Sequence, residues 1–105
     1  MFGILKNMLA KTDNNHLQKI IAEGAFLVDV RSPAEFASGN VRGSVNVPLD
    51  KVASQLVKFK DKKNIVVFCR SGNRSSQAKA ILERNGIASV TNGGIWQDVN
   101  KLVKK

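Results

Sequence analysis

The hydrophobic residues form two patterns that alternate along the chain. Short, almost continuous apolar runs are typical of strands buried on both faces, and residues 25–30 and 65–68 are the clearest examples. Between these runs, apolar residues recur every three to four positions, as on one face of a helix; Leu17, Ile20 and Ile21 are an example. The patterns predict strands over about 25–30, 45–47, 65–68 and 87–91, and helices over about 14–23, 33–38, 49–57, 74–84 and 95–103.

Several boundaries of these elements carry local signals. Ser32 is followed by Pro33 and, three positions on, by Glu35, which predicts a helix start with a capping box. Asn73 is expected to cap the helix that follows the 65–68 strand. The Asn-Gly-Gly sequence at 92–94 is expected to separate the last strand from the last helix.

Strands that alternate with helices predict the α/β class, here a three-layer α/β/α fold with a mainly parallel sheet of four to five strands. The strand number stays open because residues 3–10 read better as helix than as a first strand. A chain of 105 residues is enough for one domain with a real core, so residues 1–105 are assigned to a single domain. Ligands of such sheets bind beyond the carboxyl ends of the strands, which is where Cys69 stands.

Composition restricts the function. The net charge of +9, from 17 Lys and Arg against 8 Asp and Glu, attracts anions from small oxyanions to phosphate backbones. Because only 6% of residues are aromatic and Tyr is absent, the chain lacks the stacking surface of a single-strand nucleic-acid binder, and no nucleic-acid partner is expected. The apolar runs are far shorter than the roughly 20 residues that cross a bilayer, so we expect a soluble, cytoplasmic protein without a membrane span. The amphipathic stretch at residues 2–9 is expected to pack onto its own domain; the alternative is docking to a partner or to a membrane surface.

The candidate chemistry lies in residues 69–75, between a buried strand and a helix start. Backbone N–H groups and the helix dipole converge on an anion at such a turn. A thiolate is an anion, so the pKa of Cys69 should fall from about 8.5 toward neutrality. Arg70 and Arg74 add charges suited to a dianionic oxyanion. Cys69 is the only cysteine, which excludes an internal disulfide and a zinc site of several thiolates. The alternative is a small apolar residue at a strand end.

Four motifs, in order, resemble a single-domain rhodanese-like sulfurtransferase: DVRSPAEF at 29–36, GNVRGSVNVP at 39–48, CRSGNR at 69–74 and NGGIW at 92–96. The resemblance implies that Cys69 is the catalytic residue. It implies substrate-binding roles for Arg70, Ser71, Gly72, Asn73 and Arg74, and supporting roles for Asp29, Arg31 and Glu35, which we expect to brace the loop. Alternatively, Arg31 and Glu35 form an exposed ion pair one helical turn apart. Asn40 stands where the family commonly has histidine.

The resemblance also implies the reaction. Cys69 would carry sulfane sulfur as a persulfide, from a small anionic donor such as thiosulfate to cyanide or to a thiol, including a thiol on another protein, with no metal or organic cofactor. One alternative is a cysteine phosphatase or arsenate reductase of similar fold, in which the closing arginine stands one residue further on. Here four residues, 70–73, separate Cys69 from Arg74. The active-site loop is therefore shorter, and it fits a sulfur atom better than a phosphoryl group. The other alternative is a non-catalytic interaction module.

Overall fold

The computed structural model describes residues 14–103, so the amphipathic stretch at 2–9 and the helix expected over 3–10 lie outside the described residues. The elements follow one another in this order: α2 (Asn14–Ala22), β1 (Phe26–Asp29), α3 (Pro33–Ser38), β2 (Val45–Asn46), α4 (Leu49–Val52), the 3-10 helix η1 (Leu56–Phe59), β3 (Ile65–Cys69), α5 (Asn73–Arg84), β4 (Val90–Ile95) and α6 (Trp96–Val103).

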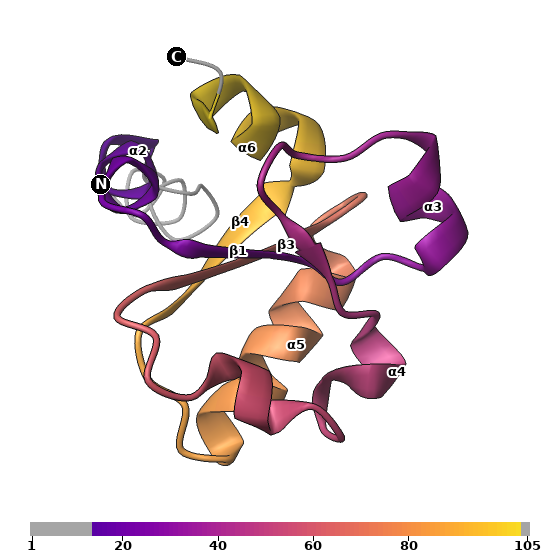
Figure 1. The fold of residues 1–105 in the computed structure, drawn as a ribbon, viewed down its shortest axis with the longest axis vertical. Helices are drawn as coiled ribbons and strands as arrows, with labels where there is room; N and C mark the ends of the chain where they lie inside the picture. Colours follow the sequence, from indigo (N-terminus) through magenta and orange to yellow (C-terminus); the bar gives the residue numbers. More distant parts are fainter. Residues whose placement is uncertain (1–13, 104–105) are drawn as a thin grey trace, which may run out of the picture.

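The sheet of the described residues has four strands, all parallel, in the order β2-β1-β3-β4. Helices cover both of its faces, with α2 and α6 on one side and α4 and α5 on the other (Figure 1). The predicted three-layer α/β/α fold is therefore confirmed, with four strands. No helix within residues 14–103 is both long and apolar enough to cross a bilayer.

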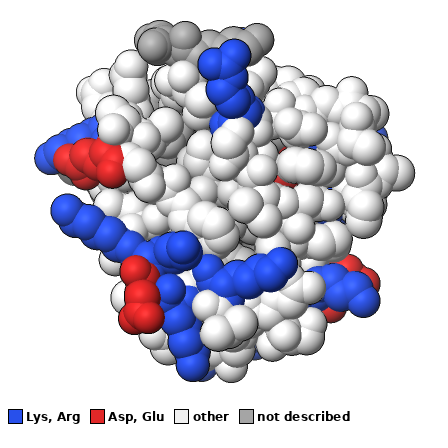
Figure 2. All heavy atoms as spheres, in the orientation of Figure 1, with Lys and Arg blue, Asp and Glu red and all other residues white. Residues whose placement is uncertain are grey.

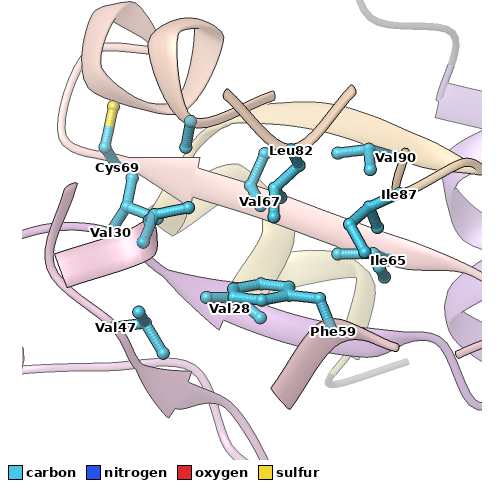
Figure 3. Packing of buried hydrophobic residues seen from close by; sticks show 12 residues of the cluster. Val28, Val30, Val47, Phe59, Ile65, Val67, Cys69, Leu82, Ile87 and Val90 are labelled. Atoms are coloured by element: carbon cyan, nitrogen blue, oxygen red, sulfur yellow. The ribbon is translucent and has the colours of Figure 1, made fainter. Parts of the chain in front are cut away.

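Strand β3 lies inside the sheet, and each of its five residues is buried. Its side chains alternate between two hydrophobic clusters, because successive residues of a strand point to opposite faces. Ile65, Val67 and Cys69 join the cluster under α4, η1 and α5, whereas Val66 and Phe68 join the cluster under α2 and α6. In Figure 3, Cys69 lies at one end of the first cluster, so the core itself fixes the position of this side chain.

Helix α3 begins as its sequence predicts. The Ser32 hydroxyl accepts a hydrogen bond from the Glu35 amide at 3.2 Å, and the Glu35 carboxylate accepts one from the Ser32 amide at 3.0 Å. These two bonds form the predicted capping box, and they satisfy two amide groups that a helix start otherwise leaves without a partner.

The continuous helix predicted over 49–57 is wrong. The segment forms the single turn α4 and then the separate 3-10 helix η1, and Val57 is 75% exposed instead of facing the core. Phe59 is the buried residue, and its ring meets that of Phe26 edge to face, with centroids 5.8 Å apart. The break between α4 and η1 lets Phe59 enter the cluster, and burying an aromatic ring stabilises the fold more than burying Val57 would.

The strand predicted over 87–91 is also misplaced. Strand β4 runs from Val90 to Ile95 and includes the Asn-Gly-Gly sequence that was expected to form a turn. The pairing with β3 is irregular here, since Val67 opposes Asn92 whereas Phe68 opposes Gly94. Gly93 is the extra residue of this bulge, and a Cβ atom on it would lie 2.9 Å from methyl groups of both Val66 and Val99. Glycine is therefore required here for close packing between β3 and α6.

We predict that Gly93→Ala destabilises the protein by about 1 to 3 kcal/mol, because the new methyl group overpacks the contact with Val66 and Val99. The φ of Gly93 lies outside the left-handed region that disfavours other residues, so the cost is steric. Equilibrium denaturant unfolding measures the effect. The control is Gly93→Ala combined with Val99→Ala, which should be less destabilised than the sum of the two single variants. Simple additivity would contradict the steric explanation.

Candidate active site around Cys69

Cys69 is the last residue of β3, and its side chain is completely buried. Helix α5 begins at Asn73, so the chain turns from strand to helix within residues 70–72. The turn needs Gly72, whose φ of +94° lies in the left-handed region that costs other residues roughly 1–2 kcal/mol. Asn73 was predicted to cap α5, but the N-cap position is Gly72 and no side chain caps the helix. Gly72 precedes the first helical residue because its left-handed backbone directs the amides of Gly72 and Ser75 toward the Cys69 sulfur.

Those amides converge on the Cys69 sulfur. The Gly72 N–H donates to Sγ at 3.0 Å and the Ser75 N–H at 3.4 Å, and Sγ lies 3.4 Å from the Ser75 hydroxyl oxygen. Burial alone would raise the pKa of the Cys69 thiol. Once the thiol is ionised, hydrogen bonds to the thiolate from the Ser75 hydroxyl and from the amides of Ser75, Ser71 and Gly72 outweigh burial, so they lower that pKa below its ordinary value. This is the direction that the sequence predicts, and it favours a nucleophilic thiolate.

The sequence predicts no individual role for two members of this network, although Ser75 lies in the segment 69–75 and Asn92 in the NGGIW motif. Ser75 is fully buried and contacts the sulfur with both its amide and its hydroxyl. Asn92, on β4, accepts a hydrogen bond from the Ser75 hydroxyl at 2.7 Å. Ser75 directly follows the CRSGNR motif, and this position is a sequence signal for a residue near the Cys69 sulfur. Asn92 is the first residue of the NGGIW motif, but nothing in that motif indicates that its side chain contacts Ser75.

The two arginines of the loop have different environments. Arg74 binds both carboxylate oxygens of Glu35, at 2.7 and 3.0 Å, and these two side chains are 34% and 30% exposed. Arg70 is exposed, and it forms no ion pair within residues 14–103. Arg74 is therefore already neutralised, whereas Arg70 carries the loop's unpaired positive charge.

The ion pair also ties α3 to the loop. The hydrogen bond from Arg74, and after it the one from the Ser32 amide, lower the pKa of Glu35 from 4.5 to about 2. Glu35 is thus the residue, among the three expected to support the loop, that contacts it directly. The alternative ion pair between Arg31 and Glu35 does not form, since each side chain has another partner.

Asp29 and Arg31 form a second, buried unit beside the site. The Arg31 guanidinium binds the Asp29 carboxylate at 2.7 to 3.0 Å, donates to the Gly39 carbonyl at 2.6 Å and lies 4.6 Å from the centroid of the Trp96 ring. These contacts hold together the end of β1, the end of α3 and the start of α6. The exposed Asn40 side chain donates to the Phe36 carbonyl at 2.9 Å, at the end of α3.

Comparison with known proteins agrees with this geometry. A family profile described as "Rhodanese-like domain" matches residues 12–98. The chain belongs to the rhodanese-like domain family. Its predicted rhodanese-like fold and its resemblance to the family are confirmed.

Named relatives of this rhodanese-like chain are similar over most of its length. A protein named sulfurtransferase from Allochromatium vinosum is 35% identical over 92 residues, which cover 84% of this chain and 86% of the relative. The Escherichia coli thiosulfate sulfurtransferase PspE is 35% identical over 74 residues, 69% of this chain and 71% of PspE. Among solved structures, the human single-domain sulfurtransferase TSTD1 superimposes with a TM-score of 0.68 at 28% identity, over 87% of this chain and 93% of TSTD1.

We predict that Glu35→Gln removes the ion pair with Arg74 but keeps an oxygen for the Ser32 amide, and that it destabilises the protein by about 0.5 to 1 kcal/mol at neutral pH. The folded pKa of Glu35 is depressed, so its contribution is complete above about pH 4.5 and is lost as the pH falls toward 2. The difference in Tm between wild type and variant should therefore shrink over that range.

The control for this experiment is Glu83→Gln, which removes an exposed carboxylate on α5 for which no ion pair is seen within residues 14–103. This variant should leave Tm nearly unchanged at every pH. A difference for Glu35→Gln that stays constant from pH 7 to pH 2 would contradict the assigned ion pair.

Proposed function

We propose that this protein is a sulfurtransferase that carries sulfane sulfur as a persulfide on Cys69. The observation that supports this most directly is the pair of backbone amides that donate to one sulfur, Gly72 N–H at 3.0 Å and Ser75 N–H at 3.4 Å, with the Ser75 hydroxyl oxygen also 3.4 Å from that sulfur. Such donors stabilise a sulfur anion without a histidine base. Relatives with about the same length of chain are named sulfurtransferase and thiosulfate sulfurtransferase.

In the first half of the proposed reaction, the Cys69 thiolate attacks the outer sulfur of thiosulfate. A bond forms between Sγ and that sulfur, the sulfur–sulfur bond of thiosulfate breaks, and sulfite leaves with the bonding electron pair. The product Cys69–S–S⁻ keeps one negative charge, now on its terminal sulfur. The amides of residues 70–74 would cradle this sulfur, as preorganised donors stabilise an oxyanion.

In the second half, a nucleophile attacks the terminal sulfur, and the Cys69 thiolate leaves. Cyanide gives thiocyanate, and a thiolate gives a new persulfide. Because the sequence holds one cysteine, the protein has no second thiol of its own to resolve the persulfide. We therefore propose that the acceptor is an external thiol on a small molecule or on another protein, and that the protein works in the reducing cytoplasm, without a nucleic-acid partner.

The net charge supports a small anionic donor. On the face shown in Figure 2, Lys and Arg side chains gather around η1, toward the start of β3, whereas Cys69 lies at the end of β3. A net charge of +9 raises the local concentration of anions. Arg70 is the unpaired charge nearest in sequence to Cys69, and we assign to it the recruitment of thiosulfate. Ser71, Gly72 and Asn73 complete the proposed binding loop.

The phosphatase or arsenate-reductase alternative receives less support. A phosphoryl group needs a free guanidinium to bind its oxygens in a bidentate manner. Arg74 already binds Glu35 through both of its terminal nitrogens. The loop therefore suits a single sulfur atom better than a phosphoryl group.

We predict that incubation with thiosulfate adds one sulfur atom to the intact mass and that dithiothreitol or cyanide removes it. Cys69→Ser should abolish the gain, because the hydroxyl is not ionised at neutral pH. Alkylation of wild-type Cys69 before incubation is the matched control, and it should also abolish the gain in mass. An unchanged mass of the wild type after incubation would contradict the proposal.

We also predict that Arg70→Ala raises KM for thiosulfate about three- to tenfold with a smaller effect on kcat, because a charged contact contributes about 1 kcal/mol to binding. Added salt should raise the KM of the wild type for thiosulfate more than it raises the KM of Arg70→Ala. Arg84→Ala is the control, since Arg84 carries the same charge at the far end of α5. Equal KM values for the two variants would show that Arg70 has no specific role.

A further inference from the structure

The Ser75 hydroxyl is close to three groups that can accept its single proton. Asn92 Oδ1 lies at 2.7 Å, the Gly72 carbonyl at 3.1 Å and the Cys69 sulfur at 3.4 Å. Ser75 is completely buried. A hydroxyl donates one hydrogen bond at a time, so these three groups compete for its proton.

The orientation of the Asn92 amide determines how that competition begins. The Gly94 N–H donates to Asn92 Oδ1 at 2.9 Å, and Asn92 Nδ2 donates to the Gly72 carbonyl at 3.4 Å. Because a backbone N–H can only donate, the atom beside it must be the amide oxygen. The short contact between Ser75 Oγ and Asn92 Oδ1 therefore holds the hydroxyl proton. Toward Cys69, Ser75 then presents a lone pair, which accepts the S–H of a neutral thiol.

This arrangement does not suit an ionised Cys69. A thiolate has no proton to donate, and a lone pair facing it is repulsive. Rotation about the Cβ–Oγ bond of Ser75 would turn the hydroxyl proton to the sulfur. Asn92 Oδ1 would still accept from the Gly94 amide, so the rotation leaves no buried oxygen without a partner.

We propose that Asn92 is a positioning residue whose side-chain oxygen competes with the Cys69 sulfur for the Ser75 hydroxyl proton. The hydroxyl turns to the sulfur when that sulfur is charged, and it returns to Asn92 when the charge moves elsewhere. This inference rests on the proposed function for the identity of the charged sulfur.

In the proposed cycle, charge resides on Sγ in the free thiolate and moves to the terminal sulfur in the persulfide. It returns to Sγ when the acceptor takes the terminal sulfur. The Ser75 hydroxyl would then stabilise Cys69 as the leaving thiolate in the second half of the reaction. Asn92 would set the free energy of this hydroxyl rotation, because each donation from Ser75 to the sulfur breaks the hydrogen bond from Ser75 Oγ to Asn92 Oδ1 at 2.7 Å.

The test is the pH dependence of the ultraviolet absorbance of the Cys69 thiolate, measured against Cys69→Ser, which reports the thiolate fraction and requires neither sulfur transfer nor access of a reagent to the buried sulfur. Ser75→Ala removes the hydroxyl donor and should raise the pKa of Cys69 by about one unit. Ser75→Thr keeps a hydroxyl and should restore the wild-type value. Asn92→Ala removes the competitor and should lower the pKa, and the uncharged, similarly sized Asn92→Leu should lower it as well.

Opposite shifts for Ser75→Ala and Asn92→Ala are the decisive result. If Asn92 only held the loop in place, Asn92→Ala would raise the pKa as Ser75→Ala does, and the inference would be overturned. An unchanged pKa in Ser75→Ala would overturn it as well. The double variant should match Ser75→Ala, because Asn92 acts through Ser75. Asn92→Leu, which has nearly the same shape and adds no charge, provides the test if Asn92→Ala does not fold.

The remaining charged groups around the loop stay the same in these variants. They are Arg70 in the turn, Arg74 on α5, Glu35 on α3 and the Asp29–Arg31 pair after β1. Asn85→Ala removes an asparagine that donates to the Ile81 carbonyl at the other end of α5, and it should leave the titration unchanged. Failure of the wild type to load sulfur would overturn the proposed function alone, since the titration is measured on the unloaded thiol.

Discussion

The structure depends on the hydrogen bonds that several donors direct to one buried sulfur. An anion removed from water is stable only if fixed dipoles replace its hydration. Strand β3 buries Cys69, and the left-handed residue Gly72 turns the following amides toward it. Helix α5 then starts immediately, so its first turn supplies the Ser75 amide and hydroxyl. The burial that makes ionisation unfavourable and the donors that make it favourable come from one continuous segment.

The strand order brings two distant segments to this loop. Strands β1 and β4 flank β3, and all of them are parallel, so their carboxyl ends meet at the same edge of the sheet. From β1 the chain enters α3, which contributes Glu35 to Arg74. From the other side, β4 contributes Asn92 to Ser75. The loop is therefore held from both sides by side chains that lie 39 and 17 residues away in the sequence.

The sequence predicts those parts of this arrangement that depend on local patterns. The apolar run at 65–68, the loop after it and the capping box at Ser32 are strong local signals, and each element forms where it is expected. Strand β4 was misplaced because its two glycines look like a turn, although Gly93 is needed for contact with Val66 and Val99. The partnership of Ser75 with Asn92 was not predicted, because a hydrogen bond between distant polar side chains leaves no periodic trace.

Glu35 serves two structures at once, since its carboxylate closes the α3 capping box and also binds Arg74. Local unfolding of α3 would therefore release the arginine that anchors the loop, and opening of the loop would weaken the start of α3. Opening of either segment is therefore coupled to opening of the other by the free energy of this one ion pair. The conformational freedom of α3 and that of the loop are linked, although the two belong to separate elements.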